Sequence, residues 1–216
     1  LAIQSNDFPV AAGFANTGSQ NVFALARWNT SLVLDTLFDT DGIVTTAIGS
    51  VDDKAYGVAV YLTGVHAGKI VAVGYSNNGA VRDFAVTRYL TGGGLDTTFD
   101  TDGIVTTNAG LTLNSEARAV AIHTSAGPQL NKIVVAGFSY TGTQNVFRVI
   151  RYNVDGSISF NFTTAIGSVD DRAYGITIQS DDRIVVVGSS NDGVKNRFAV
   201  VRYNVSGALD GTFGTG

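Results

Sequence analysis

The chain has 216 residues, with 14 basic and 18 acidic side chains, a formal net charge of −4 and no block of like charge. Because nucleic-acid-binding domains carry clustered positive charge, this balance argues against a nucleic-acid partner. The longest aliphatic runs, such as 184–187, are far shorter than the roughly 20 residues of a membrane-spanning helix, so we expect no membrane insertion.

The composition points to strands and tight turns. The chain contains 26 glycines but only 2 prolines, and it has neither cysteine nor methionine. Glycine together with abundant threonine, valine and asparagine favours β-structure over helices. Since a chain without oxidisable side chains suits an oxidising environment, we expect an extracellular or cell-surface location.

Short alternating segments recur along the chain at a spacing of about sixty residues. They begin at Leu1, Val58, Val120 and Ile176, and each is expected to be the first strand of a repeat. This divides the chain into repeat 1 (1–57), repeat 2 (58–119), repeat 3 (120–175) and repeat 4 (176–216), of which the last lacks a fourth strand. Together the repeats are expected to form one domain, because single repeats cannot cover their own apolar faces.

Three further strands are expected in each repeat. An apolar run that ends in glycine forms the second strand, as at Gly74 and Gly188, and turns such as 77–79 and 191–193 lead into a third strand. A Gly-rich turn then leads to a fourth strand at 42–46, 103–107 and 159–164. Four short antiparallel strands in a unit of this size are typical of a propeller blade.

The third strand carries the signature F-x-x-x-R-[YW] in every repeat. It occurs at Phe23/Arg27/Trp28, Phe84/Arg88/Tyr89, Phe147/Arg151/Tyr152 and Phe198/Arg202/Tyr203. Because side chains alternate across a strand, the phenylalanine and the arginine share one face and the second aromatic residue lies on the other. We interpret Arg27, Arg88, Arg151 and Arg202 as structural residues that bond to carbonyls or to an aspartate between repeats. The alternative is a ring of cationic sites for an anionic ligand.

The predicted fold class is all-β, a β-propeller-like array of four four-stranded antiparallel repeats. An open β-repeat array and part of a larger propeller are the alternatives. The motifs G-K-I-V-x-x-G, F-A-V-x-R-Y, L-D-T-T-F and D-G-I-V-T-T resemble the delta-60 repeat family of bacterial secreted and surface proteins. This resemblance implies a propeller-like fold and an extracellular setting, and it implies no activity.

Candidate chemistry is sparse. His66 and His123 are the only histidines, and no nucleophile or metalloprotease motif accompanies them, so we expect no enzyme. The D-T-D-G segments place Asp39, Asp41, Asp100 and Asp102 in loops, where carboxylates could bind calcium. Aspartate before glycine is also ordinary turn chemistry ahead of a strand. We therefore expect no cofactor, with calcium at these four residues as the alternative.

The leading functional hypothesis is an extracellular structural or interaction module, such as one bead of a tandem-repeat surface protein, an adhesin or a filament. Its expected partners are proteins or further copies of itself, which would bind the open strand edge of the last repeat. The alternative is a lectin-like propeller whose loops bind a glycan or another ligand.

Overall fold

The computed structural model describes residues 1–108 and 113–214, and their regular secondary structure is nearly all strand. The strands form two sheets of eight and seven strands, and each sheet consists of two antiparallel groups of strands, which we call blades 1 to 4. Blade 1 contains β1 (Ala2–Ile3), β2 (Pro9–Asn16), β3 (Asn21–Arg27) and β4 (Ile43–Thr46); blade 2 contains β5 (Asp52–Val60), β6 (Ile70–Asn77), β7 (Arg82–Tyr89) and β8 (Ile104–Thr107). Blade 3 contains β9 (Ser115–Ile122), β10 (Ile133–Tyr140), β11 (Asn145–Tyr152) and β12 (Ile158–Thr164); blade 4 contains β13 (Asp170–Ile178), β14 (Ile184–Asn191) and β15 (Asn196–Tyr203).

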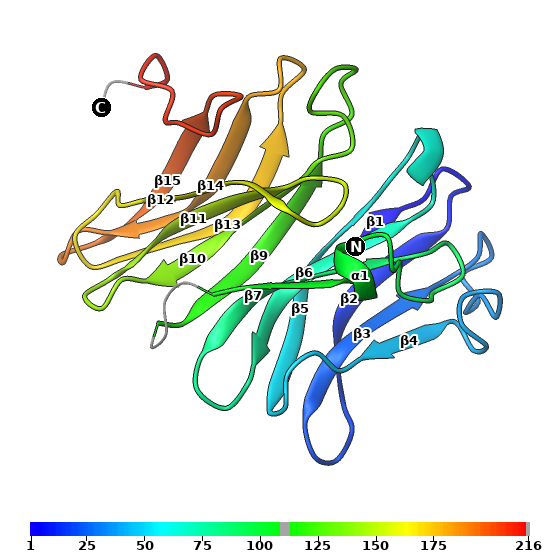
Figure 1. Ribbon diagram of the computed structural model, residues 1–216. Helices are drawn as coiled ribbons and strands as arrows, with labels where there is room; N and C mark the ends of the chain where they lie inside the picture. The colour runs from blue at the N-terminus through cyan, green and yellow to red at the C-terminus, as the bar shows by residue number, and fades with distance from the viewer. Residues whose placement is uncertain (109–112, 215–216) are drawn as a thin grey trace.

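The blades follow one another in an open arc, with blade 1 and blade 4 at its opposite ends (Figure 1). Within each blade, consecutive strands pair in antiparallel register. A single parallel pair, Asn21 with Asp52, connects blade 1 to blade 2, and Asn145 with Asp170 connects blade 3 to blade 4 in the same way. The predicted all-β, propeller-like array is therefore confirmed, and within the described residues it is open.

The apolar core is divided among three clusters, each of which lies between two successive blades. Phe84 belongs to the cluster between blades 2 and 3, whereas Tyr89 on the same strand belongs to the cluster between blades 1 and 2. Alternation along the third strand thus supplies both faces, as predicted. We call the face that carries the phenylalanine of the signature the forward face of a blade, and the face that carries the following Tyr or Trp the rear face.

In blades 2, 3 and 4 the first strand begins earlier than its apolar segment. The repeat boundaries at 57/58, 119/120 and 175/176 fall inside β5, β9 and β13. In blade 2 the strand begins with a pair of aspartates that reads as a turn in the sequence. Asp53 is nevertheless fully buried, because its carboxylate accepts hydrogen bonds from the backbone N–H groups of Ile48 and Gly49 at 2.8 and 3.0 Å.

In blades 2, 3 and 4 a β-bulge explains the glycine that ends the apolar run. Residues Tyr56, Arg118 and Tyr174 are extra residues in β5, β9 and β13, and each bulge lies beside a glycine of the second strand. A Cβ atom on Gly74 would collide with the backbone of β5. Gly13 has open space instead, because β1 is only two residues long.

Among the described residues, helical structure is limited to two short turns, η1 (Gly64–His66) and α1 (Asp100–Gly103). The second lies in a D-T-D-G segment, ahead of the fourth strand β8. In the described ranges, helices of the length and apolarity needed to cross a membrane do not occur.

Candidate interaction faces

The repeated arginine lies on the forward face and pairs with an acidic residue eight positions later. Arg27 donates to Asp35 through Nε at 2.8 Å, and Arg88 donates to Asp96 at 2.7 Å. Arg202 pairs with Asp210 at 2.8 Å in the same way. In blade 3, where Ser159 stands at this position, the Ser159 hydroxyl accepts hydrogen bonds from Arg151 instead.

Each buried arginine also reaches the next blade. Nη1 of Arg27 donates to the carbonyl of Thr91, and Nη1 of Arg88 donates to the carbonyl of Val154. Arg151 makes the equivalent bond to Val205 at 2.8 Å. Each acceptor lies two residues beyond the Tyr of the next blade's third strand. The guanidinium therefore joins its own blade to the next one through hydrogen bonds.

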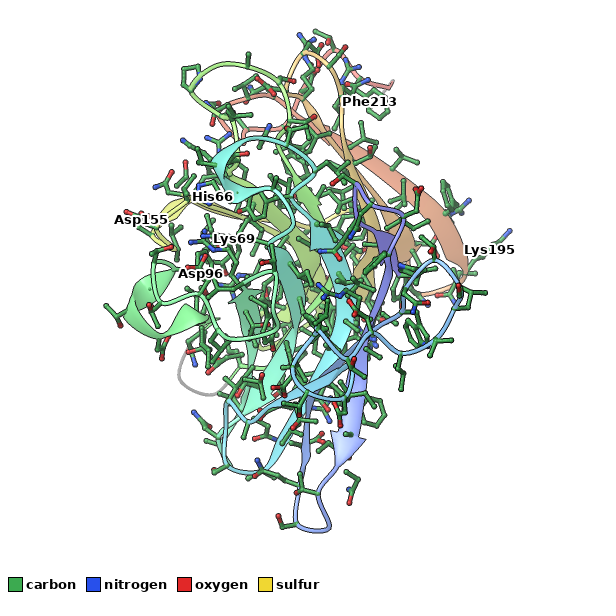
Figure 2. All side chains as sticks on the ribbon, turned by 90° about the vertical axis from the view of Figure 1, so that its right-hand side faces the viewer. His66, Lys69, Asp96, Asp155, Lys195 and Phe213 are labelled. Atoms are coloured by element: carbon green, nitrogen blue, oxygen red, sulfur yellow. The ribbon has the colours of Figure 1, made fainter. Side chains whose placement is uncertain are left out.

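An aromatic ring covers each guanidinium. Phe38, Phe99, Phe160 and Phe213 lie 4.5 to 4.7 Å from the guanidinium carbon of the arginine in their own blade. Figure 2 shows Lys69 and Asp96 side by side near Asp155, a residue of the next blade's turn, and Phe213 apart from them near the top of the view. Lys69 adds a second cation to Asp96 at 2.7 Å. Burial opposes ionisation of Asp96, but hydrogen bonds from Lys69 and Thr98 and the charge of Arg88 together hold its pKa well below the usual range.

A second contact joins the fourth strand of one blade to the rear face of the next. The hydroxyls of Tyr89 and Thr46 are 2.8 Å apart, as are those of Tyr152 and Thr107. The Tyr203 hydroxyl donates to Thr164 across the junction of blades 3 and 4. Burial raises the pKa of Tyr152 to about 12, so the phenol stays protonated and able to donate.

A third contact comes from the residue that follows the first strand. Gln4 donates to the carbonyl of Gly68 at 2.8 Å, and the Tyr61 hydroxyl donates to the carbonyl of Asn131 at 3.1 Å. His123 lies 3.1 Å from the Asp182 carboxylate. All three contacts end at the same position, the turn before the second strand of the next blade. Burial lowers the pKa of His123, and Asp182 opposes this shift.

Blade 4 presents the same forward face with no blade against it. Phe198 is 78% exposed, whereas Phe23, Phe84 and Phe147 at the equivalent position are 0% exposed. Val200 is 40% exposed, whereas its equivalents in blades 2 and 3 are fully buried. The described part of blade 4 has no fourth strand, so β15 is an edge strand whose only further pairing is one bridge between Tyr203 and Leu209.

Blade 1 presents an uncovered rear face. Ala11, Ala24 and Ala26 line a shallow apolar hollow of about 200 Å³ there, with Ile43 at its rim. Trp28 stands where the other blades have tyrosine. The two ends of the arc therefore expose the two halves of the contact that is repeated inside it.

The aspartates considered for calcium take part in turns. Asp39 and Asp100 adopt positive φ angles of 49° and 47°, and their backbone N–H groups donate to the carbonyls of Gly92 and Asp155 in the next blade. Asp41 and Asp102 accept hydrogen bonds from the backbone at the start of the fourth strands. Across residues 1–108 and 113–214, histidine, aspartate and glutamate form no group of three that could hold a metal ion.

Further hollows are lined by other described residues. One of about 540 Å³ lies between blades 1 and 2 and includes the Arg27–Asp35 pair. The other, about 370 Å³, lies at the ends of β9 and β10, and Tyr140, Arg82, Glu116 and Arg172 are among the residues that line it. Glu116 already pairs with Arg82, and Arg172 with Asp170.

The chain is similar to a β-propeller family of unknown function. A family model described as "Domain of unknown function (DUF5122) beta-propeller" matches residues 68–99, 131–158 and 179–213. These segments contain the second and third strands of blades 2, 3 and 4. No curated protein matches the chain. The family match supports the propeller fold, while the narrower resemblance to delta-60 repeats stays a prediction.

Sequence reasoning did not identify the acidic partners of the arginines or the contact made by Gln4, Tyr61 and His123. The first could have been found, because Arg and Asp stand eight residues apart in three of the four repeats. The second leaves no motif, because the equivalent position holds Gln, Tyr, His and Gln in the four blades.

Proposed function

We propose that the protein is an extracellular structural and interaction module that assembles when another β-blade docks on the forward face of blade 4. The exposure of Phe198 carries this proposal, because the equivalent phenylalanine of every other blade is completely covered. Repeat proteins that end in solution close their arrays with a polar outer face. The forward face of blade 4 is apolar instead, with Phe198, Val200 and Phe213 exposed.

The physical basis is the burial of this face. Covering a phenylalanine or valine side chain stabilises a complex by about 1.5–3 kcal/mol before the entropy of association is subtracted. Arg202 is already held against Asp210 and Phe213, so its guanidinium is oriented for a further acceptor without additional ordering. A preorganised face of this kind loses little entropy when it is covered.

Sedimentation equilibrium of the chain over a range of concentrations tests the proposal. We expect the wild type to associate and Phe198→Ser to weaken the association at least about tenfold, because central aromatic residues dominate interfaces. Val65→Ser is the matched control, since Val65 is 90% exposed on η1, away from both ends of the arc. A wild type that stays monomeric, or equal association of both variants, would refute the proposal.

The extracellular setting is supported by the absence of cysteine and methionine and by the resemblance to secreted repeats. A role as one bead of a surface protein, adhesin or filament follows from assembly through the ends of the arc. Immunodetection of the native protein at the cell surface or in the medium tests this setting, and detection only inside cells contradicts it. Pairing at the edge of β15 is a second route for the same partner blade.

Glycan binding is the second candidate function, and the hollow at Tyr140 favours it. Tyr140 is 38% exposed and lines this hollow together with Arg82, Arg172 and Glu116, a combination that suits a sugar ring and its hydroxyls. A glycan array probed with the wild type and with Tyr140→Ala tests this function. Binding that is lost in the variant supports it, and an array without hits refutes it.

A further inference from the structure

We infer that the hollow between blades 1 and 2 binds an alkylammonium group, such as a lysine side chain or a free aliphatic amine. The hollow has a volume of about 540 Å³, and the buried Asp35 is among the residues that line it. Its walls come from two neighbouring blades, with Thr91 and Gly92 of blade 2 opposite Asp35. The site is separate from the docking face of blade 4, and neither depends on the other.

Phe8 of blade 1 holds a position that belongs to a basic residue in the other blades. In every blade the residue after the first strand donates its backbone N–H to the carbonyl of the residue at this position. These bonds run from Gln4 to Phe8, from Tyr61 to Lys69, from His123 to Lys132 and from Gln179 to Arg183, at 2.8 to 3.0 Å. Blade 1 therefore lacks the cation that blades 2, 3 and 4 carry here.

In blades 2 and 4 this basic residue binds the aspartate of the repeated arginine pair. Nζ of Lys69 lies 2.7 Å from Oδ2 of Asp96 (Figure 2), and Nε of Arg183 lies 3.3 Å from Oδ2 of Asp210. The repeated arginine of each blade donates to the same oxygen, so one carboxylate accommodates two cations. Blade 3 has Ser159 instead of an aspartate and offers no carboxylate. Blade 1 thus combines the carboxylate with the loss of its second cation.

Asp35 keeps an acceptor site that its equivalents have filled. It accepts hydrogen bonds from Nε and Nη2 of Arg27 and from the backbone N–H of Leu37. Asp96 accepts a further bond from the hydroxyl of Thr98, whereas blade 1 has Leu37 at the position of Thr98. A carboxylate offers about four lone-pair sites, so Asp35 can accept one more N–H. An ammonium group in the hollow would donate it, as Lys69 does in blade 2.

The walls of the hollow suit the methylene chain of such a ligand. Phe8 lines the hollow, and its ring centroid lies 5.8 Å from the guanidinium carbon of Arg27, beside the ion pair. Leu37 is 81% exposed at the same hollow. Long cationic side chains place their methylene groups along apolar surfaces and their ammonium groups against carboxylates or aromatic faces. Phe8, Leu37 and Asp35 provide these surfaces together.

The charge of blade 1 also favours a cation over an anion. Residues 1–51 contain one basic residue, Arg27, and four aspartates, a formal net charge of −3. Arg27 is already bound to Asp35 and to the carbonyl of Thr91, so it is not a free cation for an anionic ligand. An excess of negative charge attracts cationic ligands over several ångströms.

A titration of the full chain with n-butylamine, followed by NMR at neutral pH, tests the inference. The amine reproduces the methylene chain and the ammonium group of a lysine side chain and is protonated at this pH. We expect saturable shifts of the backbone N–H signals of Leu37 and Gly92, which line the hollow. The neutral analogue 1-butanol should bind at least about tenfold more weakly, because a charge-assisted hydrogen bond is roughly twice as strong as a neutral one.

Phe8→Lys is the decisive variant, because it returns to blade 1 the cation that blade 2 has at this position. The new side chain should occupy Asp35 and weaken the binding of n-butylamine at least about tenfold. Val194→Lys is the matched control. It adds the same charge in the turn between β14 and β15, where Val194 is 84% exposed, and should bind n-butylamine like the wild type. The comparison with 1-butanol uses the wild type, so it decides even if Phe8→Lys fails to fold.

Nα-acetyl-lysine methylamide and 1,4-diaminobutane distinguish the two sources of the ammonium group. Tighter binding of the lysine derivative indicates a peptide ligand, tighter binding of the diamine indicates a free amine, and either result supports the site. Three results would overturn the inference: no saturable shift with n-butylamine, equal binding of 1-butanol, or wild-type affinity in Phe8→Lys. These measurements do not involve blade 4, so their failure leaves the proposed docking of a further blade untouched.

Discussion

Replacing Arg88 by leucine tests whether the repeated arginines hold the blades together. The side chain is fully buried, with Nε 2.7 Å from Asp96 and Nη1 2.6 Å from the carbonyl of Val154. Removing one partner of a buried ion pair costs about 3–5 kcal/mol, because the other charge is left without compensation. Lys69 still contacts Asp96 in the variant, so we expect a loss near the lower end, about 3 kcal/mol in the free energy of unfolding.

Urea unfolding at neutral pH measures this loss, at a protein concentration where the chain is monomeric. The transition midpoint should fall while the slope of the free energy against urea stays unchanged. Arg202→Leu is the matched control, because Arg202 pairs with Asp210 but has no blade ahead of it in the described part of the chain. We expect a clearly smaller loss for the control. Equal losses, or an unchanged midpoint for Arg88→Leu, would refute the interpretation.

Two further predictions concern a glycine and a histidine. Gly74→Ala should strongly lower the melting temperature because its Cβ would collide with the bulged strand β5, whereas Gly13→Ala should leave it almost unchanged; equal melting temperatures would contradict this explanation. His123 has a pKa below the usual 6.5, so the unfolded chain binds its proton more readily and this contribution to stability is full above pH 6.5 and lost as the pH falls. His123→Gln should reduce the acid-induced fall in unfolding free energy just below pH 6.5. His66→Gln is measured as a control, because the pKa of His66 is lowered as well. A pH dependence of the His123→Gln variant identical to that of the wild type would disprove the role of His123.

The third strand was predictable because its side chains alternate with a strict period. Phe and Arg on one face and Tyr on the other are visible in the sequence, and the structure places them in different clusters, as for Phe84 and Tyr89. The number of repeats follows from the same signature. The interpretation of the arginine in this signature as a structural residue needed only the rule that a buried guanidinium group requires hydrogen-bond acceptors.

The start of the first strand was not predictable from its hydrophobicity. Asp52 and Asp53 have the composition of a turn, yet they begin β5. Asp53 is tolerated in a buried position because backbone N–H groups outside the strand satisfy its carboxylate, and such groups have no signature in a sequence. The contact of Gln4, Tyr61 and His123 was hidden for a related reason, since three different side chains reach the same turn of the next blade.

The folding of this chain and its proposed assembly depend on the same kind of contact. Blades 1, 2 and 3 are each covered on the forward face by the next blade through one apolar cluster and a few polar bonds, whereas the forward face of blade 4 is exposed. A change on the forward face therefore has an effect that depends on the blade in which it lies. At Phe84 it should lower the stability of the monomer, because a neighbouring blade already covers the side chain. At Phe198 it should leave the four described blades stable, because none of them covers this side chain, and it should weaken the proposed docking of a further blade.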